Sequence, residues 1–165
     1  MKKARLGAAW DILPAEAKKI WNSGNFIWLY IANMRYFMKA AKMSKTKVIV
    51  YQDKDSSVPL IKWLKNQPQK VQDKCAAMIE LLAASGHKLR RPYADYIENG
   101  IYELRPTVKR VQYRILYCFV GKNVVLLTHG LVKTDKIPRA EIKRAIEYRN
   151  KFIQDPSLHG YEMKA

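Results

Sequence analysis

The sequence predicts an α+β domain in which helices pack on an antiparallel sheet, and three observations support this class. A β-branched strand pattern at 48–51 is followed by two amphipathic helical patterns. Three apolar strand patterns then come in succession, at about 100–105, 111–120 and 123–132. A last helical pattern begins at Pro138. The predicted order is therefore β-α-α-β-β-β-α, with sequential strands paired antiparallel across short turns and the helices on one face of the sheet.

The two helices after the first strand have clear boundary signals. Pro59 and Pro68 stand where helices commonly begin, and Ser85 with Gly86 marks the end of the second helix. Apolar residues recur at helical spacing in the second helix, at Val71, Cys75, Met78, Ile79 and Leu82. We expect an αα-hairpin whose apolar faces belong to the core, without a direct role in function.

The final strands and helix complete the predicted domain, which spans 43–155. Gly121 and Lys122 predict a tight hairpin between the last two strands. The last helix carries apolar residues that we expect on one face, at Ile142, Ala145, Ile146 and Ile153. Residues 156–165 show no periodic pattern and are expected to form a flexible tail.

Residues 1–42 differ from the rest of the chain and are treated as an N-terminal helical extension. They contain three of the four tryptophans, and Asn22 to Asn25 break the segment into two helical patterns. Three interpretations are open. The segment is upstream sequence before a natural start at Met43, a helical arm that packs on the domain or a partner, or an amphipathic helix on a membrane surface.

Charge and composition narrow the class of function. Lys and Arg number 31 against 14 Asp and Glu, a formal charge of +17, which is typical of a protein that meets a polyanion such as nucleic acid. An acidic protein partner or solubility alone is the alternative. Cys75 and Cys118 lack metal-ligand spacing and are expected to be buried free thiols. We expect a cytoplasmic protein with no membrane span, no metal site and no cofactor.

The candidate catalytic residues lie in the strand region. Arg105, Arg114 and Lys133 lie near strand ends, and His129 shares the strand parity of Lys133. Arginine forks bind phosphate, fixed cations stabilise charge that develops during cleavage, and histidine is an acid or base near neutral pH. A sheet that presents these groups on one face is suited to binding, and cutting, a phosphodiester.

Several segments in order resemble the RelE/HigB superfamily of type II toxins, most closely its phage-derived HigB-like branch. They are Ile101-Tyr-Glu-Leu-Arg-Pro, Tyr113-Arg-Ile-Leu-Tyr, Val125-Leu-Leu-Thr-His-Gly-Leu-Val-Lys, and the upstream Leu81-Leu-Ala-Ala-Ser-Gly-His and Arg91-Pro-Tyr. The resemblance covers about 43–155. It implies a metal-independent endoribonuclease that cuts messenger RNA, usually on the ribosome, and a helix-turn-helix antitoxin as partner. The ribose 2′-OH attacks the adjacent phosphate.

The resemblance also assigns roles to residues. The functional arginines of the family match Arg105 and Arg114, its histidine matches His129, and its basic residue after the last strand matches Lys133. We expect the arginines on the phosphate, His129 as acid or base and Lys133 as electrostatic support. RNA-binding candidates outside this set are Arg90, Arg91, Tyr93 and Lys136.

Each assignment has a structural alternative that stays open. Arg105 and Arg114 could form salt bridges with Glu103 or Asp135, and His129 could orient the loop at the end of its strand. The chain also departs from the family at Thr134 and Asp135, because relatives of this branch often carry a second basic residue directly after Lys133.

Three functions are therefore compared. The first is an mRNA interferase, the toxin of a toxin–antitoxin pair. The second is a non-cleaving RNA-binding relative, which Asp135 and the extension favour. The third is an interaction module whose basic face binds an acidic antitoxin. Cleavage assays separate the first from the other two.

Overall fold

This computed structural model describes residues 46–133 and 136–162, apart from the side chain of Lys133. The chain divides into two units, Met1–Met43 and Ser44–Ala165, and every described residue belongs to the second. The predicted extension at 1–42 and the departure at Thr134 and Asp135 lie outside the described residues.

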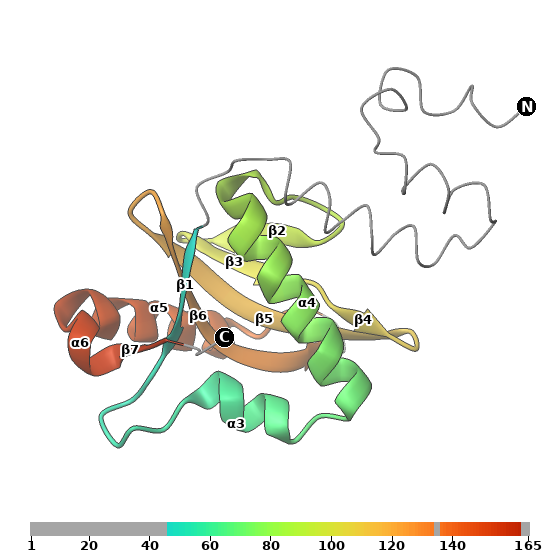
Figure 1. The fold of residues 1–165 in the computed structure, drawn as a ribbon, viewed down its shortest axis with the longest axis horizontal. Helices are drawn as coiled ribbons and strands as arrows, with labels where there is room; N and C mark the ends of the chain where they lie inside the picture. Colours follow the sequence, from blue (N-terminus) through green and yellow to red (C-terminus); the bar gives the residue numbers. More distant parts are fainter. Residues whose placement is uncertain (1–45, 134–135, 163–165) are drawn as a thin grey trace, which may run out of the picture. The chain divides into compact units, whose positions relative to one another are not determined.

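The described unit is an α+β structure, as predicted (Figure 1). Its strands are β1 (Lys47–Tyr51), β2 (Ala94–Glu98), β3 (Ile101–Leu104), β4 (Thr107–Val108), β5 (Val111–Val120), β6 (Val124–Lys133) and β7 (Gly160–Tyr161). Its helices are α3 (Pro59–Lys65), α4 (Gln69–Ser85), the 3-10 turn η3 (Gly86–Lys88), α5 (Arg139–Gln154) and α6 (Pro156–His159).

The sheet is mixed, so the prediction of a purely antiparallel sheet was wrong. The strand order is β2-β3-β5-β6-β1-β7, with β4 paired to β5. β1 runs parallel to β6, with Lys47 opposite Val124 and Val50 opposite Leu127. Short turns predict the pairing of sequential strands, but β1 and β6 are separated by two helices and four strands, and no local signal specifies their pairing.

Three strands, one short helix and the 3-10 turn η3 were not predicted from the pattern. β2 pairs antiparallel with β3 through a turn at Asn99 and Gly100, both with positive φ (51° and 77°). Residues 156–161, expected to lack structure, form α6 and then β7, which pairs with β1. Asp155 is the N-cap of α6, and its carboxylate accepts a hydrogen bond from the backbone N–H of Leu158.

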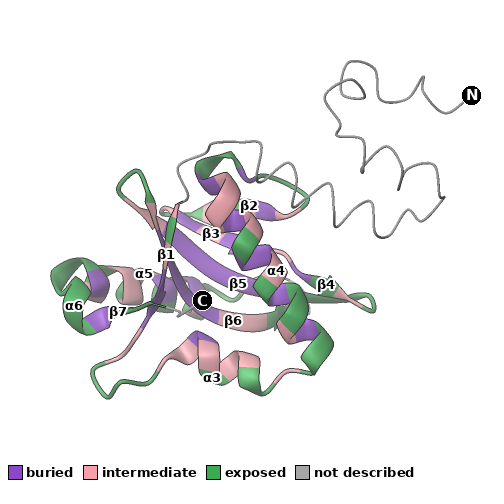
Figure 2. Cartoon of the chain, viewed as in Figure 1, coloured by how far each residue is buried: buried purple, intermediate pink, exposed green. Residues whose placement is uncertain are grey.

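The predicted αα-hairpin is confirmed, and it covers one face of the sheet. α3 begins at Pro59 and α4 follows Pro68, and the predicted apolar positions of α4 are all buried. Their side chains pack with Leu104, Ile115 and Leu127 from the sheet. Figure 2 shows α4 passing in front of the sheet, with buried and exposed stretches alternating along the helix.

Helix α5 packs on the opposite face, so the prediction that the helices lie on one face of the sheet was wrong. The orientation of α5 corrects a second prediction. Ile142, Ala145 and Phe152 are buried against Leu116 and Leu126 of the sheet. Ile153, expected on the same face, is 56% exposed. The buried positions are three and seven residues apart, so they lie on one face of the helix. Phe152 continues this buried face, and Ile153 does not.

Both cysteines are buried free thiols, as predicted. Burial raises the pKa of Cys75 to about 11 and that of Cys118 to about 12. These thiols therefore stay protonated near neutral pH and serve as small core residues.

Candidate functional site

A β-bulge decides which face of β6 carries His129. Leu116 of β5 pairs with His129, whereas the next residue, Tyr117, pairs with Leu127. Thr128 is thus the extra residue, and its buried hydroxyl donates a 2.9 Å hydrogen bond to the carbonyl of Leu116. The bulge reverses the alternation along β6 and places His129 on the face that α5 covers.

The same face carries the predicted arginines. Glu103 of β3 and His129 of β6 both pair with Leu116 of β5, and Arg114 lies one position along the same face, opposite Leu131. The pairing of β3, β5 and β6 therefore places Arg114 and His129 on one face of the sheet, together with Glu103.

Arg114 is a buried arginine held by one ion pair and two hydrogen bonds. Its side chain is 1% exposed, and its Nε lies 2.8 Å from Oε2 of Glu103. Nη2 donates to Oε1 of Gln112 at 2.7 Å, and Nη1 donates to the carbonyl of Tyr113 at 2.6 Å. Burial lowers the pKa of Arg114 and the charge of Glu103 opposes this, so the guanidinium remains charged.

Arg105 lies between two carboxylates and is accessible. Asp95 and Glu103 pair directly across β2 and β3, an arrangement of like charges that is unfavourable alone. Arg105 relieves it, because its Nε lies 3.5 Å from Glu103 and its Nη1 lies 3.9 Å from Asp95. Its side chain is 26% exposed, so it is partly accessible to solvent.

Arg91 extends this arrangement to the edge of the sheet. Its Nε donates to Oδ2 of Asp95 at 2.8 Å, and its side chain is 74% exposed. The hydrogen bond from Arg91, with a smaller contribution from Arg105, holds the pKa of Asp95 below its usual range.

Together these five residues form what we call the arginine chain: Arg91, Asp95, Arg105, Glu103 and Arg114, in order of contact. It contains three cations and two carboxylates and therefore carries an excess positive charge. Burial falls from Arg114 to Arg91, so the exposed end of the chain is the part that an anionic ligand can reach.

His129 is brought to the same face but is covered by α5. It is 5% exposed, and its Nε2 lies 2.8 Å from Oε2 of Glu141, an atom that also accepts from Arg144 at 3.0 Å. The edge of its ring meets Tyr148, with centroids 5.8 Å apart. In this arrangement His129 connects β6 to α5.

The protonation of His129 follows from this environment. Burial lowers its pKa, and the carboxylate of Glu141 opposes the shift. The imidazole is therefore neutral at pH 7, with Nε2 donating to Glu141 and Nδ1 left as the acceptor. Nδ1 is buried and finds no hydrogen-bond partner among the described residues.

The predicted lysines lie at the end of β6 and just beyond it. Lys133 is the last residue of β6, and its backbone pairs with Gln112, the residue that accepts from Arg114. Lys136 is exposed and precedes α5. Asp135, proposed to place a negative charge nearby, lies outside the described residues.

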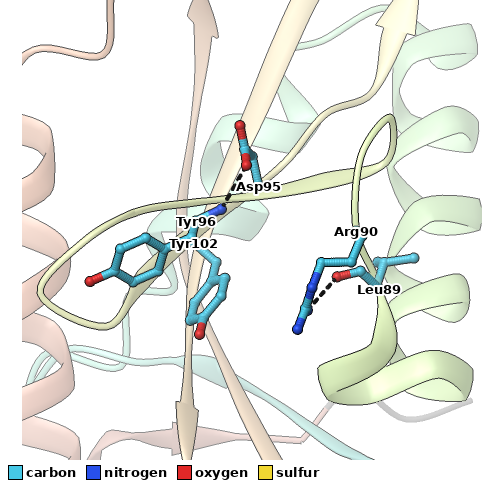
Figure 3. Close-up of a pocket in the computed structure, with 5 residues that line it drawn as sticks. All are labelled: Leu89, Arg90, Asp95, Tyr96 and Tyr102. Atoms are coloured by element: carbon cyan, nitrogen blue, oxygen red, sulfur yellow. Dashed lines mark hydrogen bonds between the residues drawn. The ribbon is translucent and has the colours of Figure 1, made fainter.

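Arg90 and Tyr93 lie in the segment that precedes strand β2. Tyr93 is partly buried against the core under α3 and α4, and its carbonyl accepts from the backbone N–H of Arg105 at 2.9 Å. Arg90 is exposed and lines a cavity of about 190 Å³ with Leu89, Asp95, Tyr96 and Tyr102 (Figure 3).

Sequence reasoning overlooked Asp95 and Tyr96, although a signal was present. Asn99 and Gly100 form one of the strongest short hairpin motifs, because both central residues of such a turn need positive φ. That motif would have predicted β2, and with it the pairing of Tyr96 with Tyr102. Glu141 carries no comparable signal, because its contact with His129 depends on how α5 packs.

Two further findings limit the chemistry of this part of the chain. Within residues 46–133 and 136–162, no three His, Cys, Asp or Glu side chains are grouped so that they could bind a metal ion. No helix among these residues is both long and apolar enough to cross a bilayer.

The fold and the site define a small α+β domain with a basic, arginine-rich sheet face. Residues 62–150 match the model of the phage-derived Gp49-like protein family (DUF891), and the chain belongs to that family. The family is part of the RelE/HigB-like toxin superfamily and is associated with the toxins of toxin–antitoxin systems. A comparison with curated proteins found no match.

Proposed function

We propose that this protein is the toxin of a type II toxin–antitoxin pair, of the HigB-like kind, and that it cleaves messenger RNA on the ribosome. The observation that carries the proposal is Arg105: it is accessible, oriented by two carboxylates and backed by a buried arginine. A guanidinium placed in this way keeps N–H donors that can bind a phosphate.

The reaction is attack of a ribose 2′-OH on the adjacent phosphate. The bond to the 5′-oxygen breaks, leaving a 2′,3′-cyclic phosphate on one product and a 5′-hydroxyl on the other. Negative charge builds on the non-bridging oxygens in the transition state, and fixed cations stabilise it. Arg105 binds those oxygens, and Lys133 adds positive charge from the end of β6.

The structure supports different roles for the other predicted residues. Arg114 is buried against Glu103 and acts by positioning Glu103, which in turn orients Arg105. His129 is covered by α5 and bonded to Glu141, so it reaches RNA only if the first turn of α5 moves away. We propose that His129 is a positioning residue in the conformation described and an acid or base only after such a movement.

Purified full-length protein, ribosomes and a defined message test the proposal. The expected result is cleavage at discrete sites, with 2′,3′-cyclic phosphate or 3′-phosphate ends and 5′-hydroxyl ends. An antitoxin partner is implied by the family and would be expected to suppress this cleavage.

A second function is favoured by one specific observation. Two of the four predicted catalytic residues, Arg114 and His129, are at least 95% buried. That burial fits an RNA-binding protein that holds phosphate through Arg105 and Arg91 without cutting it. Salt-dependent RNA binding by the wild-type chain, with no cleavage on or off the ribosome, would identify this second function.

A further inference from the structure

Three tyrosines form a row across neighbouring strands on the sheet face opposite the arginine chain. Tyr96 of β2 pairs with Tyr102 of β3, which pairs with Tyr117 of β5. The rings of Tyr102 and Tyr117 stack with centroids 5.4 Å apart, and Tyr96 meets Tyr102 edge-on at 5.2 Å. Tyr117 is 1% exposed and Tyr96 is 56% exposed, so the row leads from the core to the surface.

The outer end of this row lines a pocket. The tyrosine pocket is bounded by Leu89, Arg90, Asp95, Tyr96 and Tyr102 and has a volume of about 190 Å³. Figure 3 shows the two tyrosine rings on one side of the pocket and the side chain of Arg90 on the other. Drug-sized ligands usually occupy roughly 300–1,000 Å³, so this pocket suits a single flat ring system.

Arg90 is held in place rather than free to rotate. Its Nη1 donates to the carbonyl of Leu89 at 3.0 Å and to that of His87 at 2.5 Å. Nη1 is thereby saturated, and Nη2 and Nε are the remaining donors of the planar group. A guanidinium and an aromatic ring facing each other across a narrow pocket match the two sides of a nucleobase, since proteins stack bases on both.

The charge around the pocket favours an anionic chain over a neutral ligand. The carboxylate of Asp95 is engaged by Arg91 and lies near Arg105, so it does not present an unpaired negative charge. Asp95 belongs to both the arginine chain and the tyrosine pocket, which makes β2 the shared boundary of the two. A single strand passing over the edge of β2 would meet cations on one side and aromatic rings on the other.

We propose that the tyrosine pocket binds one unpaired nucleobase of single-stranded RNA, stacked on Tyr96 and Tyr102 and faced by Arg90. The proposal deepens the proposed function and rests on its assumption that RNA is the ligand. Stacking is tolerant of base identity, so the pocket anchors the strand without reading its sequence. The adjacent phosphates are then directed to Arg91 and Arg105.

The test measures RNA binding separately from cleavage. Full-length protein is titrated into a fluorescent single-stranded RNA about ten nucleotides long, methylated on every 2′-oxygen so that it cannot be cut. The variants are Tyr96→Ala, Tyr96→Phe and Arg90→Ala. Tyr161→Ala is the matched control, because Tyr161 is a 39% exposed tyrosine in β7, the strand at the opposite edge of the sheet.

Tyr96→Ala is expected to lose about 5- to 150-fold in affinity, which corresponds to the free energy of stacking one base on an aromatic ring. Tyr96→Phe keeps the ring and should bind like wild type, as should Tyr161→Ala. An oligonucleotide of the same length that is abasic at every position should bind the wild-type chain and Tyr96→Ala with similar affinity.

Two results would contradict the proposal that the tyrosine pocket binds a nucleobase. One is equal affinity for Tyr96→Ala and Tyr161→Ala, and the other is the absence of single-strand binding by the wild-type chain at low salt. Neither decides whether the protein is a nuclease, because cleavage of ribosome-bound message by the wild-type chain is measured independently. If the wild-type chain cleaves message but Tyr96→Ala binds RNA like wild type, the proposed function stands and the tyrosine pocket has no part in it.

Discussion

Oε2 of Glu103 lies 2.8 Å from Nε of Arg114, and both side chains are more than 90% buried. Two opposite charges are thus removed from water and depend on each other. The same carboxylate group reaches Arg105 through its other oxygen at 3.5 Å. Glu103 therefore couples the stability of the sheet to the orientation of the exposed arginine.

Replacing Glu103 by Gln should destabilise the protein markedly. The substitution keeps the shape but leaves the charge of Arg114 buried without a counterion, which typically costs about 3–5 kcal/mol. Urea unfolding gives the free energy of unfolding. Asp95→Asn is the matched control from the paired position in β2, and because Asp95 is partly exposed it should cost less than about 1 kcal/mol. Equal, small effects of both changes would show that the buried pair is not coupled.

Arg105→Ala should abolish most of the cleavage activity while leaving the fold intact. Removing one oriented donor to developing charge typically costs about 10²- to 10³-fold in rate. Arg105→Lys should recover only part of it, because lysine lacks the bidentate fork. The measurement is the cleavage rate on programmed ribosomes, with circular dichroism to confirm folding. Lys122→Ala, an exposed cation in the β5–β6 turn, should cleave at the wild-type rate; a similar loss there would assign the effect to overall charge.

His129 should make stability depend on pH in a defined direction. Burial lowers its pKa in the folded protein below the value of about 6.5 in the unfolded chain. The unfolded state then binds more protons, so the stabilisation is present above about pH 6.5 and is lost as the pH falls towards the folded pKa. Urea midpoints at pH 7.5 and 5.5 should differ more for wild type than for His129→Gln. An identical difference in the two proteins would contradict this environment for His129.

Gly130 should not tolerate a side chain. A Cβ at this position would lie 2.1 Å from Cε3 of Trp63, the residue that packs α3 on β6. Gly130→Ala should therefore cost about 1–3 kcal/mol or more through overpacking. Gly121→Ala is the control, because nothing lies within 4 Å of its Cβ position and only the strain of a positive φ of 69° remains. The comparison is made by thermal unfolding, and a smaller effect at Gly130 than at Gly121 would contradict the packing described.

The sequence predicted β5 and β6 closely because long apolar runs bounded by turn residues have few other conformations. It predicted that Arg105, Arg114 and His129 share a sheet face; the register places Arg114 and His129 on one face, and Arg105, which follows β3, lies beside Glu103 of that face. It could not predict that Arg114 and His129 are buried. That outcome depends on the docking of α5 and on the bulge at Thr128, and both are set by packing between distant segments rather than by local pattern.

The most direct test of the central proposal is inducible expression of the full chain, with growth recorded and the 5′ ends of cellular messages mapped. The expected result is growth arrest and new 5′-hydroxyl ends inside coding sequences, both removed by Arg105→Ala. Soluble, folded wild-type protein that produces no new ends would contradict the nuclease proposal and leave the non-cleaving RNA-binding function in its place.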